Sequence, residues 1–125
     1  MKLLPALATI LLSGCALVPT QFDSTLYDHI VVLSESVDNA AKDCGTPGMA
    51  SQAEMLNYQS KVILKYTTFT SKDAHDSVAL VDKAITELNT IYQASTPSTT
   101  YCKLKLRIID ADLHEVLTAV GGKHK

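Results

Sequence analysis

The stretch AHDSVALVDKAITELNTIY (74–92) decides the fold of this chain. Its apolar residues recur at alternating spacings of four and three, which places them along one side of an α-helix. Ser71 or Asp73 can cap the start of this helix, and ASTPSTT (94–100) follows it as a loop. The sequence therefore predicts an amphipathic helix with one buried seam, formed by Ala74, Val78, Val81, Ile85, Leu88 and Tyr92.

Two further segments repeat this spacing, one near each end of the chain. The first starts after Asp23 or Ser24, either of which can cap it, and CGTPG (44–48) ends it. The last ends at Gly121 and Gly122, as expected for a helix C-terminus. The predicted seams are Leu26, Ile30, Leu33, Val37, Ala40 and Cys44 in the first segment, and Cys102, Leu106, Ile109, Leu113, Val116 and Val120 in the last.

The segment between 51 and 70 is less regular. Ser51 and Glu54 fit a capping box at its start. Its predicted seam is Leu56, Val62, Ile63, Tyr66 and Phe69. KVILKYTTFT (61–70) is rich in β-branched and aromatic residues, and CKLKLRI also alternates as a strand does. We therefore expect an all-α, antiparallel four-helix bundle over 24–122, with an α+β fold that pairs 61–70 and 101–109 as the alternative.

The N-terminus has the organisation of an export signal. Lys2 precedes about ten apolar residues, too few to span a bilayer, which needs roughly 20. LLSGC (11–15) then resembles the lipobox of bacterial lipoproteins, whose pattern is Leu, a small residue, Gly or Ala, then Cys. The alternative is an ordinary signal peptide that happens to contain a cysteine.

The resemblance implies a lipid anchor at Cys15. In that family the leader, here residues 1–14, is removed, the cysteine receives a diacylglyceryl group, and the new amino terminus is acylated, for example with palmitate. Lipoproteins without Asp after the cysteine go to the outer membrane, and Ala16 follows Cys15 here. An outer-membrane anchor facing the periplasm is therefore implied. Residues 15–23 would form a lipidated tether, and 123–125 a basic tail.

Removing 14 of the 125 residues leaves a single-domain length of 111. It also removes Lys2, which changes the net charge from −2 to −3. This charge is neither basic enough for a nucleic-acid-binding chain nor acidic enough to suggest a disordered tail. Cys44 and Cys102 remain, and an even pair in an exported chain suggests a disulfide, with two buried free thiols as the alternative. Cys44 closes the first seam and Cys102 opens the last, so an up-down bundle brings them to the same end.

No catalytic motif is present. The sequence has no G-x-S-x-G elbow, S-x-x-K or glycine-rich phosphate loop. It also lacks C-x-x-C-H for haem attachment and a Glu-x-x-His pair for di-iron. We therefore expect no enzyme, no cofactor and no metal. A ligand- or metal-binding bundle is the alternative, because the topology brings His29, His75 and His114 towards the membrane-proximal end.

Two features are candidates for binding a partner. Lys103, Lys105 and Arg107 cluster at the start of the last segment. Tyr27, Tyr58 and Tyr101 fall outside the seams, and tyrosine is favoured at interfaces, although core flanks explain these positions equally well. The sequence thus favours a lipid-anchored, periplasm-facing adaptor resembling a secretion pilotin or an exclusion protein, with an envelope protein as partner.

Overall fold

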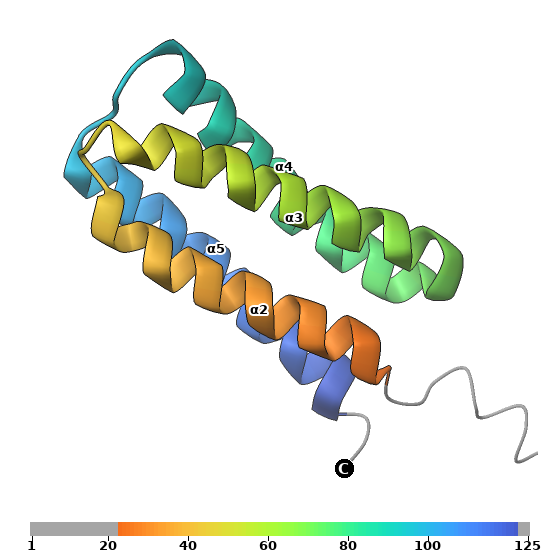
Figure 1. Ribbon diagram of the computed structural model, residues 1–125. Helices are drawn as coiled ribbons and strands as arrows, with labels where there is room; N and C mark the ends of the chain where they lie inside the picture. Colours follow the sequence, from red (N-terminus) through yellow and green to blue (C-terminus); the bar gives the residue numbers. More distant parts are fainter. Residues whose placement is uncertain (1–22, 123–125) are drawn as a thin grey trace, which may run out of the picture.

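The computed structural model describes residues 23–122, and these form an antiparallel four-helix bundle (Figure 1). The bundle consists of α2 (Ser24–Ala40), α3 (Gly48–Thr70), α4 (Lys72–Ala94) and α5 (Thr99–Gly122), with a short 3₁₀ helix, η2 (Ala41–Asp43), after α2. The predicted all-α fold is therefore confirmed. The α+β alternative is wrong, because 61–70 lies inside α3 and 101–109 lies inside α5.

Each helix packs against two others. α2 contacts α3 and α5, and α4 contacts the same two helices from the other side. In Figure 1 the start of α2 and the end of α5 lie together, at the opposite end from the loop between α2 and α3. The two ends of the described chain, residues 23 and 122, therefore lie at the same end of the bundle. No helix within 23–122 has the length and apolar character needed to cross a membrane.

Side-chain caps start three of the four helices. Asp23 accepts a hydrogen bond from the Leu26 amide at 3.1 Å, and Ser71 accepts one from the Ala74 amide at 3.2 Å. Ser98 does the same for the Tyr101 amide at 3.1 Å, at the start of α5. Each cap satisfies an amide that has no partner within the helix.

The predicted capping box at Ser51 is wrong, because α3 begins three residues earlier, at Gly48. Pro47 precedes it with φ −60°, the value that its ring imposes and that suits entry into a helix. Met49 then lies in the first turn and is completely buried. Burial of this side chain stabilises the additional turn.

The core follows the predicted seams in α2, α4 and α5, where every seam residue is buried except the half-buried Val120. The seam predicted for α3 is only partly correct. Val62 and Phe69 were expected inside but are 41% and 80% exposed. Ser60 and Thr67 take the inward positions, which they tolerate because their hydroxyls are hydrogen-bonded. Ser60 donates to the Asp82 carboxylate of α4, and Thr67 donates to the Leu64 carbonyl one turn back. The buried residues of α3 are Met49, Ala53, Leu56, Ser60, Ile63 and Thr67.

Candidate functional site

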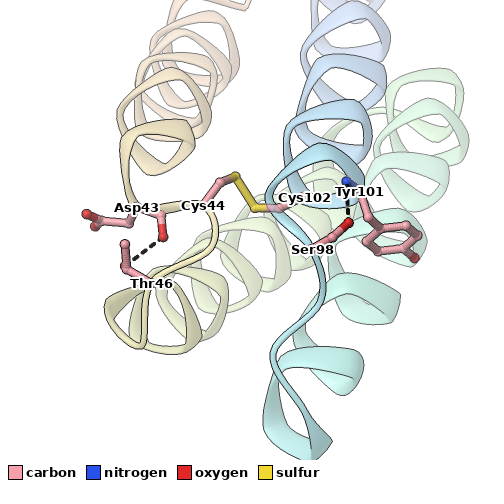
Figure 2. The surroundings of a disulfide bond; sticks show 6 residues. All are labelled: Asp43, Cys44, Thr46, Ser98, Tyr101 and Cys102. Atoms are coloured by element: carbon pink, nitrogen blue, oxygen red, sulfur yellow. Dashed lines mark hydrogen bonds between the residues drawn. A yellow bond between two sulfur atoms is a disulfide. The ribbon is translucent and has the colours of Figure 1, made fainter.

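The end of the bundle at the α2–α3 loop is closed by the disulfide between Cys44 and Cys102 (Figure 2). The sulfurs are 2.04 Å apart and the Cα atoms 5.6 Å apart, which confirms the predicted pair. Thr46 donates to the Asp43 carbonyl at 2.7 Å and shapes the turn. Gly45 has φ +83°, and a Cβ placed on it would collide with the Thr99 side chain. This end is therefore rigidly built and offers no free thiol in the described chain.

Cys15, the expected lipidation site, lies outside the described residues, as do the leader (1–14), most of the tether and the tail (123–125). The tether's last residue, Asp23, is described. Its carboxylate caps α2 and also accepts a hydrogen bond of 2.9 Å from the Tyr66 hydroxyl of α3. The expected tether thus joins the body at a fixed point, at the end opposite the disulfide.

The three basic residues singled out in the sequence do not form one patch. Lys103 and Arg107 lie with Lys42 along a depression of about 400 Å³ between α2 and α5. Lys105 points away from it, and its ammonium lies 4.0 Å from the Glu87 carboxylate of α4. Residues two apart on a helix face different sides, which explains the separation. Asp38 and Asp110 also line the depression, so its charge is mixed.

The three histidines belong to three different helices. His29 is exposed and meets the Tyr66 ring edge-on, with ring centroids 6.1 Å apart. His75 lies 3.7 Å from the Asp76 carboxylate, and His114 is exposed. Within 23–122 no three His, Cys, Asp or Glu side chains are grouped so that they could hold a metal ion.

A polar layer joins α3 to α4. Asp82 is only 6% exposed, and its carboxylate accepts hydrogen bonds from the Ser60 hydroxyl at 2.7 Å and the Lys61 ammonium at 2.8 Å. Asn57 donates to the Thr86 hydroxyl at 2.9 Å beside it. The carboxylate is therefore occupied by groups of the protein itself. We interpret this layer as one that fixes the register of the two helices.

Two tyrosines have raised pKa values. Burial, followed by the hydrogen bond to Asp23 and its charge, raises the pKa of Tyr66. Burial also raises the pKa of Tyr92, whose hydroxyl faces the Gly45 backbone without forming a hydrogen bond of normal geometry. Both groups stay protonated at neutral pH.

The outer side of α3 carries a second apolar stripe. Its spacing of three, four and seven residues places the stripe along one line of the helix. With Val32 of α2 it forms what we call the α2/α3 face, which consists of Val32, Met55, Tyr58, Val62 and Phe69, exposed by 54%, 55%, 71%, 41% and 80%.

A narrow groove runs through the centre of the α2/α3 face. Its volume is about 120 Å³, and carbon atoms make up nearly all of its exposed lining. The lining residues are His29, Val32, Leu33, Tyr58, Gln59, Val62 and Ile63. Exposed apolar surface gathered on one side of a small protein is typical of an interaction site.

This face could be predicted only in part from the sequence. Tyr58 was among the residues outside the seams, whereas Val62 and Phe69 were assigned to the core. The signal that could have separated them is the seven-residue repeat of Met55, Val62 and Phe69, which runs beside the true core stripe. A helix with two apolar stripes can bury only one of them against its own bundle, so the other remains exposed.

In comparisons with known proteins the chain matches no protein-family model, no curated protein and no solved structure.

Proposed function

We propose that this chain is a lipid-anchored protein of the outer membrane that faces the periplasm and acts as a non-enzymatic adaptor for an envelope protein. Anchorage is supported by LLSGC (11–15), which follows a short apolar leader. Stable anchoring in a membrane needs more than one acyl chain. Lipoproteins with a lipobox meet this need, because they carry a diacylglyceryl group and an amino-terminal acyl chain. The adaptor would act in the manner of a secretion pilotin or of an exclusion protein.

One observation carries the interaction role, namely the α2/α3 face. Burying apolar surface is the main favourable contribution to most protein associations, and aromatic side chains dominate their energetics. Tyr58 and Phe69 offer two such side chains to solvent, with aliphatic neighbours on the same helix. α3, which carries both, is held to α4 by the hydrogen bonds of Ser60 and Lys61 to Asp82, and its Tyr66 hydroxyl bonds to the Asp23 cap of α2. The face is therefore preorganised for a partner.

Position relative to the membrane also supports the adaptor role. The eight residues 16–23 span at most roughly 28 Å when extended. A partner bound to the α2/α3 face would therefore be kept close to the inner leaflet of the outer membrane. Restricting it to that layer raises its effective concentration for assembly there.

The experiment combines fractionation with photo-crosslinking in living cells. A photoreactive amino acid placed along the surface of the full chain should crosslink to one envelope protein in the outer-membrane fraction. Cys15→Ala should remove the protein from that fraction and abolish the crosslink. Ala16→Asp serves as the matched control, because it retains the lipid but, by the sorting rule, holds the protein at the inner membrane. Unchanged location and crosslinking in Cys15→Ala would refute the proposal.

A further inference from the structure

The α2/α3 face has the dimensions of a helix-binding site. Met55 and Phe69 are fourteen residues apart on α3, which is roughly 21 Å along the helix axis. A helix that docks in a groove uses apolar anchors spaced three, four and seven residues apart. The outer stripe of α3 presents the same spacing, and Val32 forms the opposite wall. By contrast, about 120 Å³ is small for a ligand pocket, which typically holds roughly 300–1,000 Å³.

One flank of the groove is acidic. α2 contains no Lys or Arg between Ser24 and Ala40. Its exposed outer side carries Asp28 and Glu35, which lie on the same helical stripe as Val32, four residues before it and three after. The α3 flank has Glu54 and Lys65 as well as Lys61, which pairs with Asp82, so it favours neither sign. Charge complementarity therefore calls for Lys or Arg on the side of an occupant that faces α2.

The wall of the groove contains an unsatisfied polar group. Gln59 lines the groove, and its Oε1 atom is buried without a hydrogen-bond donor in the described chain. Leaving such an acceptor unpaired is costly. Because Gln59 lines the groove, an N–H or O–H of an occupant could pair with its amide oxygen. Tryptophan and tyrosine combine an apolar ring with such a donor.

We infer that the groove binds a basic amphipathic helix of the partner, with one Trp or Tyr seated between Val32, Tyr58 and Val62, and with Lys or Arg opposite Asp28 and Glu35. This inference rests on the proposed adaptor function and specifies the chemistry of the partner. The contact joins the apolar stripe, the acidic flank and the Gln59 amide in one site.

The absence of tryptophan from the chain makes the test direct. The probe is a synthetic amphipathic helix of roughly 18 residues, because shorter isolated helices are marginal. It carries one Trp and leucines on one side and lysines on the other. A matched peptide has glutamate in place of every lysine. The full-length lipidated protein is held in phosphatidylcholine nanodiscs, with empty nanodiscs as the blank, so the Trp emission reports only seating in the protein.

We expect the lysine peptide to bind saturably, with its Trp emission shifted to shorter wavelength, and the glutamate peptide to bind at least about tenfold more weakly. Val62→Lys should weaken binding of the lysine peptide by at least about tenfold. Leu80→Lys is the matched control, since Leu80 is 69% exposed and lines a depression between α4 and α5. It adds the same charge elsewhere and should change binding little. Circular dichroism of both variants confirms that the bundle is folded.

Several results would overturn the inference. One is the absence of binding by either peptide, and another is equal affinity for both. A third is an equal loss of lysine-peptide binding in the Val62→Lys and Leu80→Lys variants. A dimer that Val62→Lys dissociates would show that a second copy occupies the face instead. If the peptides fail while an envelope protein still crosslinks in a Cys15-dependent manner, the groove assignment falls and the adaptor function stands.

Discussion

Cys44, just beyond η2, is bonded to Cys102 in the first turn of α5, so the disulfide links the first helix of the bundle to the last across a sequence separation of 58 residues. Both cysteines are buried, at 7% and 0% exposure. The bond fixes the end of the bundle opposite the expected membrane anchor. It therefore stabilises the whole body without constraining the tether.

Breaking this disulfide should destabilise the bundle substantially. For a loop of this length the chain-entropy account gives about 4 kcal/mol, and other accounts give less. We expect the Cys44→Ala, Cys102→Ala double variant to lose roughly 2–4 kcal/mol of unfolding free energy, measured by urea denaturation. Wild-type protein under a reducing agent is the companion sample and should lose a comparable amount. An unchanged urea midpoint in both would contradict the role given to the bond.

Gly45 is required by its backbone conformation. Its φ of +83° costs a residue with a Cβ roughly 1–2 kcal/mol, and the collision with Thr99 adds to this. Gly45→Ala should therefore lower the thermal midpoint clearly. Gly48→Ala is the control, because a Cβ there would meet only ordinary contacts at 3.5 Å or more. That variant should be neutral or slightly stabilising; equal effects at the two positions would count against the assignment.

In the buried polar layer between α3 and α4, removal of the Ser60 hydroxyl alone should lower the unfolding free energy. Ser60→Ala removes one of the donors to the Asp82 carboxylate, which then keeps Lys61 alone. We expect a loss of roughly 1–3 kcal/mol. Ser51→Ala, on the exposed side of the same helix, should stay within about 0.5 kcal/mol of wild type. Calorimetry of the two variants side by side tests this, and similar midpoints for both would be inconsistent with the layer's contribution.

Tyr66 and Tyr92 should respond oppositely to loss of the hydroxyl. Tyr66→Phe removes the hydrogen bond to the Asp23 cap and should cost about 1 kcal/mol. Tyr92→Phe removes a buried hydroxyl that lacks a well-formed bond, so it should be neutral or stabilising. Urea denaturation at pH 8 measures both, and destabilisation by Tyr92→Phe would indicate a partner for this group.

Tyr66 and Tyr92 also make the unfolding free energy depend on pH. Their folded-state pKa values are raised above the ordinary 10.0, so the stability they provide is fully present below pH 10. It is lost as the pH rises through the folded-state values, because the unfolded chain ionises first. We expect the unfolding free energy to fall above about pH 10, less steeply in Tyr92→Phe. A slope identical to that of wild type in this variant would exclude Tyr92 as a contributor.

Most of the fold follows from periodicity. In α2, α4 and α5 the apolar residues occupy one side with little ambiguity, so the seams and the disulfide could be predicted together. The core side of α3 is harder to predict. Residues 61–70 are rich in β-branched residues, as a strand is, and the helix carries two apolar stripes. Its core positions include Ser60 and Thr67, which a hydropathy pattern assigns to the surface. Their hydroxyls gain hydrogen-bond partners, the Asp82 carboxylate and the Leu64 carbonyl, only in the folded bundle.

The candidate site was less predictable than the fold. Which of two stripes on α3 faces outward depends on the rotation of the helix against α2 and α4. That rotation is set by contacts such as Ser60 with Asp82 and Tyr66 with Asp23. Each joins residues distant in the sequence, so neither can be read from a local pattern. The basic residues 103, 105 and 107 show the converse, because their closeness in sequence does not bring their side chains together.

The lipid anchor and the disulfide can be tested together by the intact mass of the protein extracted from membranes, before and after reduction and thiol alkylation. We expect the mass of residues 15–125 plus a diacylglyceryl group and an amino-terminal acyl chain, with Cys44 and Cys102 alkylated only after reduction. A mass without lipid, recovered from the soluble periplasm, would contradict it. Cys15 would then be incidental, and the tethered adaptor would have to be abandoned.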